Sequence, residues 1–161
     1  MTSTALIEQA RLFVRRHFAR DIPKWMAFHD LDHTLEVARF SQSIGRGSGL
    51  SEQAVRELEL AALFHDTGYA RSYKGHEEKS VVIATAFLRG HGGSTRLIAQ
   101  VRALILSTRV TERPRSLAQR VLRDADSAKA GQADFEEKSQ RLRTEFEHQR
   151  RKKISDRKSV V

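Results

Sequence analysis

The chain has 161 residues, of which 39% are hydrophobic and 30% charged, and its formal net charge is +9 at pH 7. This length predicts a single domain that can bury a core of its own. The absence of cysteine excludes disulfides, thiolate metal sites and cysteine nucleophiles. No stretch approaches the ~18 apolar residues that a membrane span needs, so we expect a cytoplasmic protein with no membrane partner.

Apolar residues recur at helical spacing along nearly the whole chain, and no sustained alternation typical of strands interrupts them. The first three helices are expected over 3–19, from 30 to the glycine cluster at 45–49, and over 51–64, where Ser51 resembles an N-cap. A polar loop over 67–75 should follow. Further helices are expected over 76–89, 94–107, 116–130 and from 134 onward, with Gly131 separating the last two. Short connections favour a compact all-α domain of six to seven helices.

Positive charge is concentrated at the C-terminal end. From Arg141 to Val161 there are eight Lys/Arg and three Asp/Glu, which gives +5 of the total +9. We interpret the basic segment 147–161 as a solvated helix end or tail. A non-specific phosphate or nucleic-acid contact is the alternative, but no aromatic residue is interleaved to stack on bases, so nucleic acid is not the expected partner.

Four of the seven histidines fall at the ends of largely apolar helical stripes. His33 lies on the stripe of the second predicted helix, and His29 joins it if that helix reaches back one turn. The adjacent pair His65 and Asp66 ends the third helix, and His76 begins the fourth. We therefore expect several helix ends to converge on one polar pocket at the edge of the core.

A buried, unpaired carboxylate such as Asp66 needs a cation or strong donors to compensate it. A divalent metal ion supplies that charge, and imidazole and carboxylate ligands suit Mn, Fe, Co, Ni or Zn. His33 would add a nitrogen, and a second carboxylate should come from Asp124 or Asp126, which flank their apolar arc on opposite sides, so periodicity does not choose between them. The alternative, that each histidine is an ordinary core residue, is weakened by four of them falling on three helices.

Three segments of the sequence, FHDLDHTLEVARF, LAALFHDTGYARSYKGHEEKS and VLRDADSAKAG, resemble a known family in their order and spacing. They are similar to the HD-domain superfamily of metal-dependent phosphohydrolases, especially to a small branch with His-Asp-Thr-Gly and Asp-Ala-Asp runs. The resemblance covers about residues 25–146, which we take as the core of one HD domain spanning 1–161. It implies an all-α HD-domain fold and hydrolysis of a phosphate ester or anhydride, often in a nucleotide. The implied cofactor is one divalent ion, with Mg added to the metals above.

The resemblance also implies roles for individual residues. It assigns the metal ligands to His33, His65, Asp66 and Asp126, so the choice that periodicity left open is made by the family pattern. Asp124 then becomes a supporting or helix-surface charge.

Catalytic and supporting roles are expected of several residues around these ligands. Asp66 is expected to accept a proton from the attacking water while it binds the ion, and His76 corresponds to a family histidine that binds substrate phosphate or a second metal. His29 and Glu77 are expected to support the site, although Glu77 would also complement the dipole of its helix.

Cations near these motifs should neutralise the substrate phosphate, unless they are solvated surface charges. The candidates are Arg71, Lys74, Lys79 and Arg109.

One departure from the family pattern bears on the number of metals. Ser107 and Thr108 stand in the region where binuclear members carry a His-His pair, which argues against a second metal and against cleavage of cyclic dinucleotides. The expected partner is a small phosphorylated substrate, with a homo-oligomer also allowed. The alternative function is a catalytically silent HD-fold module that binds a nucleotide or a partner protein.

Overall fold

The computed structural model describes residues 2–128 and 132–158, with side chains described up to Arg151. Within these residues the chain forms seven α-helices, one 3-10 helix and no strand, so the all-α prediction is confirmed. In chain order the elements are α1 (Thr4–Asp21), α2 (Leu31–Gly47), α3 (Glu52–Phe64), η1 (Thr67–Ala70), α4 (His76–Gly90), α5 (Thr95–Leu106), α6 (Leu117–Asp126) and α7 (Phe135–Lys158). No helix in the described part of the chain is long and apolar enough to span a membrane.

Side-chain caps fix where several helices begin. The predicted cap at Ser51 is confirmed, because its hydroxyl accepts a hydrogen bond from the N–H of Ala54 at 3.2 Å. Asp30 caps α2 in the same way and accepts from the N–H of His33 at 2.9 Å. Such a cap stabilises a helix by ~1 kcal/mol. The cap at Asp30 also fixes His33 in the first turn of α2.

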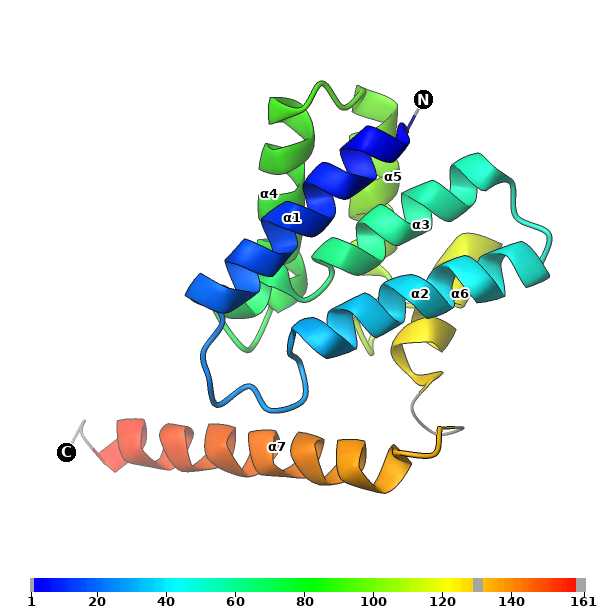
Figure 1. The fold of residues 1–161 in the computed structure, drawn as a ribbon. Helices are drawn as coiled ribbons and strands as arrows, with labels where there is room; N and C mark the ends of the chain where they lie inside the picture. The colour runs from blue at the N-terminus through cyan, green and yellow to red at the C-terminus, as the bar shows by residue number, and fades with distance from the viewer. Residues whose placement is uncertain (1, 129–131, 159–161) are drawn as a thin grey trace.

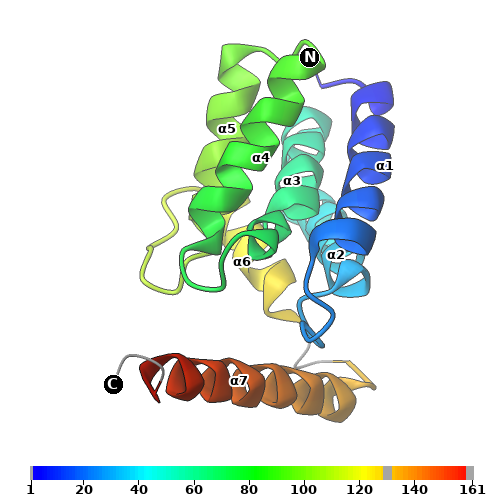
Figure 2. The ribbon, with the colours of Figure 1, turned by 90° about the vertical axis from the view of Figure 1, so that its left-hand side faces the viewer.

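Helix α3 is the central helix of the bundle, with α1, α2 and α5 packed around it (Figures 1 and 2). It is buried on nearly every side from Val55 to Phe64, rather than along the single apolar arc that the sequence predicted. Burial extends even to Glu57 and Glu59, whose charges are paired with Arg96 and Arg11. The helix therefore carries the residues that follow it, at 65 and 66, into the interior of the protein.

The expected polar loop over 67–75 begins instead with the buried 3-10 helix η1. A Cβ atom on Gly68 would lie 1.9 Å from the carbonyl oxygen of His76, so only glycine lets η1 lie directly against the first turn of α4. The hydroxyl of Ser80 accepts from the N–H of Gly68 at 2.8 Å and donates to the carbonyl of His65 at 2.6 Å. Helix α4 thus holds the segment after α3 in place.

The end of α6 differs from the sequence prediction. Helix α6 ends at Asp126 with Ser127 as its C-cap, whereas the sequence predicted a helix up to Ala130. Ala130 and Gly131 lie outside the described residues. Helix α7 lies beneath the bundle in Figures 1 and 2, and its Lys138 pairs with Glu36 of α2.

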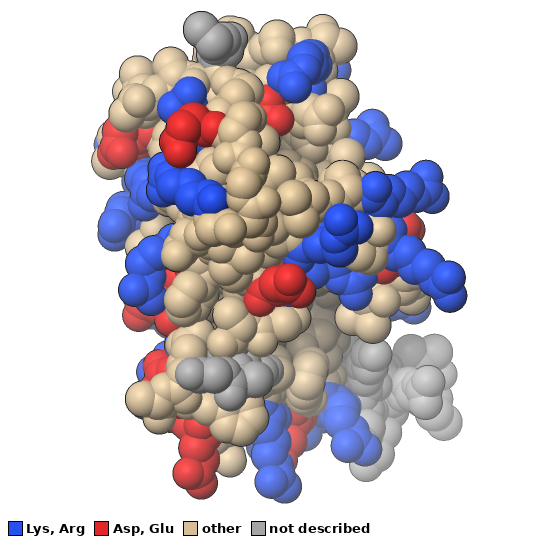
Figure 3. All heavy atoms as spheres, turned by 90° about the vertical axis from the view of Figure 1, so that its right-hand side faces the viewer, with Lys and Arg blue, Asp and Glu red and all other residues tan. Residues whose placement is uncertain are grey.

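Positive and negative side chains are mixed on one face of the protein. On the face shown in Figure 3, Lys and Arg side chains are spread from top to bottom, and Asp and Glu side chains lie among them. Of the basic segment 147–161, residues up to Lys158 are helical and side chains are described only up to Arg151.

Candidate metal centre

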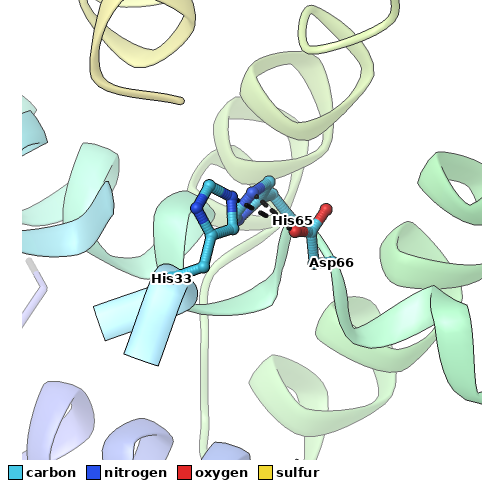
Figure 4. Close-up of side chains that lie close together, drawn as sticks. All are labelled: His33, His65 and Asp66. Carbon is cyan, nitrogen blue, oxygen red and sulfur yellow. Dashed lines mark ion pairs between the residues drawn. The ribbon is translucent and has the colours of Figure 1, made fainter. Parts of the chain in front are cut away.

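Two histidines and two aspartates meet at the ends of three helices. His33 lies in the first turn of α2, His65 caps the end of α3 with Asp66 directly after it, and Asp126 is the last residue of α6. Figure 4 shows the side chains of His33, His65 and Asp66 pointing toward one another. Their ligand atoms lie within 4.8 Å of one another.

The distances in this cluster suit one shared cation. Nε2 of His65 is 3.1 Å from Oδ2 of Asp66 and 3.4 Å from Oδ1 of Asp126. Nε2 of His33 is 3.1 Å from Oδ1 of Asp126 and 3.6 Å from Oδ2 of Asp66. Two atoms that coordinate the same ion at ~2.0–2.2 Å are separated by about 2.8–3.6 Å at ordinary coordination angles. Each of these four histidine–aspartate distances therefore matches the spacing of two ligands of one ion.

The hydrogen bonding of His65 provides an independent test of this fit. Its Nδ1–H donates to the carbonyl oxygen of Ala62 at 2.7 Å, which leaves Nε2 as the free nitrogen of the neutral ring. Nε2 of His65 and Oδ2 of Asp66 are both buried without a hydrogen-bond partner. A nitrogen lone pair beside carboxylate oxygens is unfavourable unless a cation lies between them. The residues present therefore fit a divalent metal ion.

Electrostatics at the cluster favour two ionised carboxylates. Burial alone would raise the pKa of Asp66, but the adjacent His65 ring, when it is protonated, holds that pKa well below its ordinary value. Burial likewise opposes ionisation of Asp126, yet the charge of His65 and a hydrogen bond from His33 lower its pKa. Burial tends to lower the pKa of His65, but the two carboxylates raise it well above its ordinary value. The site therefore attracts a cation, either a proton or a metal ion.

The structure separates the two aspartates of α6. Asp126 faces the histidines, whereas Asp124 is exposed, and no hydrogen bond or ion pair among the described residues joins it to the cluster. Two positions along a helix differ by about 200° in direction, so only one of the pair can face inward. The expectation that Asp124 supports the site is therefore corrected: it is a surface residue.

His76 and Glu77 border the cluster at the start of α4. Nε2 of His76 lies 3.5 Å from Oδ1 of Asp66, the oxygen not shared with His33 and His65. Oε2 of Glu77 lies 3.6 Å from Nδ1 of His76. Tyr69 of η1 stacks on His76, with ring centroids 3.8 Å apart. His76 is therefore held between a carboxylate and an aromatic ring at the edge of the cluster.

Glu145 of α7 supports His29, and sequence reasoning missed it. Its side chain is fully buried and accepts hydrogen bonds from the backbone N–H groups of Phe28 and His29 at 3.0 and 3.1 Å. The Nδ1–H of His29 donates to the same carboxylate. Burial opposes the charge of each partner, but their mutual contact raises the pKa of His29 and lowers that of Glu145. In the sequence, Glu145 is one acid among many charged residues of its helix, and no pattern distinguishes it.

A cavity of about 650 Å³ opens over the cluster. Asp66, His76 and Asp126 line one part of it, and His29 and Lys74 also border it. Thr108, in the region where binuclear relatives carry histidines, lines it as well, with its hydroxyl donating to the carbonyl of Ile105 at 2.8 Å. Within the described residues, His33, His65 and Asp66 are the one group of three or more His, Asp or Glu side chains whose ligand atoms all lie within 4.8 Å of one another.

Three of the four predicted phosphate-binding cations are placed elsewhere. Arg71 lines a separate cavity of about 850 Å³ between α1 and α4, which contains none of the cluster residues. Arg109 pairs with Glu78, and Lys79 is exposed and absent from the lining of the cavity over the cluster. Arg71 lies elsewhere because η1 turns it toward α1, and Lys79 does so because the first turn of α4 directs successive side chains to different sides.

Comparison with known proteins agrees with this geometry. The family model described as "HD domain" matches residues 30–131. Among solved structures, the chain is similar to a predicted HD superfamily hydrolase from an uncultured Thermotogales bacterium, with a TM-score of 0.62 and 27% sequence identity. The match covers 76% of this chain and 67% of that one. No curated protein matches the chain.

Proposed function

The chain belongs to the HD-domain family, whose members bind divalent metals, and on this basis we propose that it hydrolyses a phosphate ester or anhydride, with a nucleotide as the favoured class of substrate. The observation that carries the proposal is the buried Nε2 of His65. It faces two carboxylates and lacks a hydrogen-bond partner. We assign the ligands as His33, His65, Asp66 and Asp126.

The bound ion would supply a Lewis acid that acidifies water and neutralises charge on phosphoryl oxygens. The two oxygens of Asp66 have different neighbours, since Oδ2 faces the other ligands and Oδ1 faces Nε2 of His76. Asp66 can therefore hold the ion with Oδ2 while Oδ1 accepts a proton from the attacking water. The Nδ1–H of His76 donates to the carbonyl of Tyr73 at 3.3 Å, so Nε2 is the atom that exchanges that proton with Asp66.

Two further residues that line the cavity would contact the substrate. Lys74 lines the cavity and would pair with the phosphate. His29 lines the same cavity, and its contact with Glu145 favours the protonated ring, so it would donate a hydrogen bond or a proton on the leaving-group side. Both roles depend on the phosphate lying between these side chains and the ligand cluster.

A phosphate-release assay tests the proposal. Purified protein, loaded in turn with Mn, Fe, Co, Ni, Zn or Mg, is incubated with a set of nucleotides and simple phosphate esters. Release that requires metal and disappears in Asp66→Ala supports the hydrolase. Tight nucleotide binding by the metal-loaded protein without release from any compound would instead identify a catalytically silent binding module.

A further inference from the structure

Apolar side chains that are unusually exposed border the cavity over the metal cluster. Phe146 of α7 is 49% exposed and Val110, after α5, is 92% exposed, and both line this cavity. Leu142, one turn before Phe146 on α7, lines it too. Apolar surface is more stable when it is buried than when it is exposed to water, and an exposed apolar patch beside a polar site marks a place where a ligand can bind.

Helix α7 is held firmly enough to serve as a wall of the cavity. The buried carboxylate of Glu145, adjacent to Phe146, binds two backbone N–H groups of the segment before α2. His148 stacks on Trp25 with ring centroids 4.6 Å apart, and Lys138 Nζ lies 2.7 Å from Glu36. These contacts fix the rotation of α7 about its axis and so fix which of its side chains face the cavity.

Aromatic rings continue from the metal cluster toward α7. Tyr69, which stacks on His76, is 5.3 Å from Tyr73 between ring centroids, and both tyrosines line the cavity. A substrate whose phosphate lies at the cluster would extend its other end along these rings. Flat aromatic groups gain most from such a surface, because their faces can stack on the aromatic side chains.

The charged residues of the cavity limit how many phosphate groups a bound substrate can carry. Among the described residues that line it, Lys74 is the one Lys or Arg, whereas Asp66, Glu77 and Asp126 are acidic. Asp66 and Asp126 offset the charge of a divalent ion, so Lys74 and the protonated ring of His29 are the cations left to face the substrate, and a triphosphate would bring more negative charge than they neutralise. The volume of about 650 Å³ lies within the usual range for small organic ligands.

We propose that Leu142 and Phe146 of α7, together with Val110, bind the aromatic group of the substrate and make the protein selective for monophosphates that carry a nucleobase. This inference rests on the proposed function, because it places the phosphate at the cluster of His33, His65, Asp66 and Asp126. It assigns α7, which lies outside the bundle, the role of determining specificity.

Steady-state kinetics on the metal-loaded full chain test this. The substrates are AMP and UMP, with glycerol phosphate as a monoester without a ring and ATP as the triphosphate. Phe146→Ala should raise KM for the nucleoside monophosphates about tenfold, the effect of losing one stacking contact, with kcat and the KM for glycerol phosphate unchanged. Phe135→Ala is the matched control, since Phe135 is a 44% exposed residue of the same helix outside this cavity, and it should change neither constant.

The outcomes separate this inference from the proposed function. Equal KM changes for AMP and glycerol phosphate in Phe146→Ala, no change for either nucleoside monophosphate, or a preference of the wild type for ATP would overturn the specificity assignment while hydrolysis stands. If no compound is hydrolysed, the proposed function fails, and calorimetric binding of AMP and UMP to the metal-loaded protein decides the assignment. Binding weakened by Phe146→Ala and not by Phe135→Ala supports it, and the absence of binding overturns it.

Discussion

The carboxylate of Glu145 and the ring of His29 form a buried contact across 116 residues of sequence, with Oε1 and Nδ1 2.5 Å apart. The other oxygen of Glu145 accepts from the backbone N–H groups of Phe28 and His29. One side chain of the last helix thereby fixes the chain just before α2, where His33 lies. The proposed ligand set and α7 are coupled through this contact.

Replacing Glu145 by Gln should lower the free energy of unfolding by ~1–3 kcal/mol, because hydrogen bonds to a buried charged group are lost or weakened. Glu147→Gln, on the same helix but in an exposed pair with Arg143, should change it by less than about 0.5 kcal/mol. Chemical denaturation of the three proteins gives the comparison. Equal stabilities would contradict the account of the contact.

The effect of Glu145→Gln should depend on pH. The pKa of Glu145 is lowered from 4.5, so its stabilisation is present above pH 4.5 and is lost as pH falls through the folded-state pKa. The pKa of His29 is raised from 6.5, so its contribution is complete below pH 6.5 and is lost as pH rises through the folded-state pKa. The difference between wild type and variant should therefore be largest between pH 4.5 and 6.5. A difference that is constant from acid to alkaline pH would contradict this.

Gly68→Ala should disrupt the turn that carries Asp66. The new Cβ atom would lie 1.9 Å from the carbonyl oxygen of His76, so η1 and α4 must separate, at a cost of more than about 2 kcal/mol. Gly47→Ala is the matched control, because nothing lies within 4 Å of its added Cβ, and it should be neutral or slightly stabilising. Thermal unfolding of both variants checks the contrast, and a Gly68→Ala protein as stable as Gly47→Ala would contradict the packing.

Asp126→Asn should reduce metal affinity about 100-fold or more, since it removes a charged oxygen from the ligand set. Asp124→Asn carries the same change two residues away on the exposed side of α6 and should bind metal as the wild type does. Competition with a chelator measures both affinities. Identical affinities in the two variants would show that the second carboxylate is wrongly assigned.

Lys74→Ala should raise KM for a phosphorylated substrate about tenfold with a smaller change in kcat, because it removes the lysine that lines the cavity. Lys79→Ala removes an equal charge from an exposed position outside that cavity and should leave KM unchanged. KM measured at two salt concentrations distinguishes a direct contact between Lys74 and the phosphate from long-range attraction by the net charge of the protein, because salt screens the long-range attraction more strongly. An equal effect of both substitutions would point to the long-range attraction.

Much of the fold follows from local sequence signals. Helical periodicity and the cap at Ser51 predicted the element order because these signals act within a few residues. The turn at η1 was missed, since its burial depends on the contact between Gly68 and α4, which no local pattern contains. Helix α6 likewise ends earlier than its composition suggested.

The site was predictable where the side chains follow helix ends. His33, His65 and Asp66 were expected to meet because each marks the end of an apolar stripe, and the structure brings them together. The family pattern selects Asp126 rather than Asp124 as the ligand, and the structure agrees, whereas helical periodicity could not choose between them. Glu145 could not have been found, because a single acid in a highly charged helix gives no sign that it is buried.

The metal content of the purified protein is the most direct test of the central claim. Elemental analysis should find about one divalent ion per chain in the wild type and almost none in Asp66→Ala, which should keep its helical circular dichroism. A wild-type protein that binds no divalent ion when one is supplied, or an Asp66→Ala variant that retains a full equivalent, would contradict the assignment of His33, His65, Asp66 and Asp126 as a ligand set.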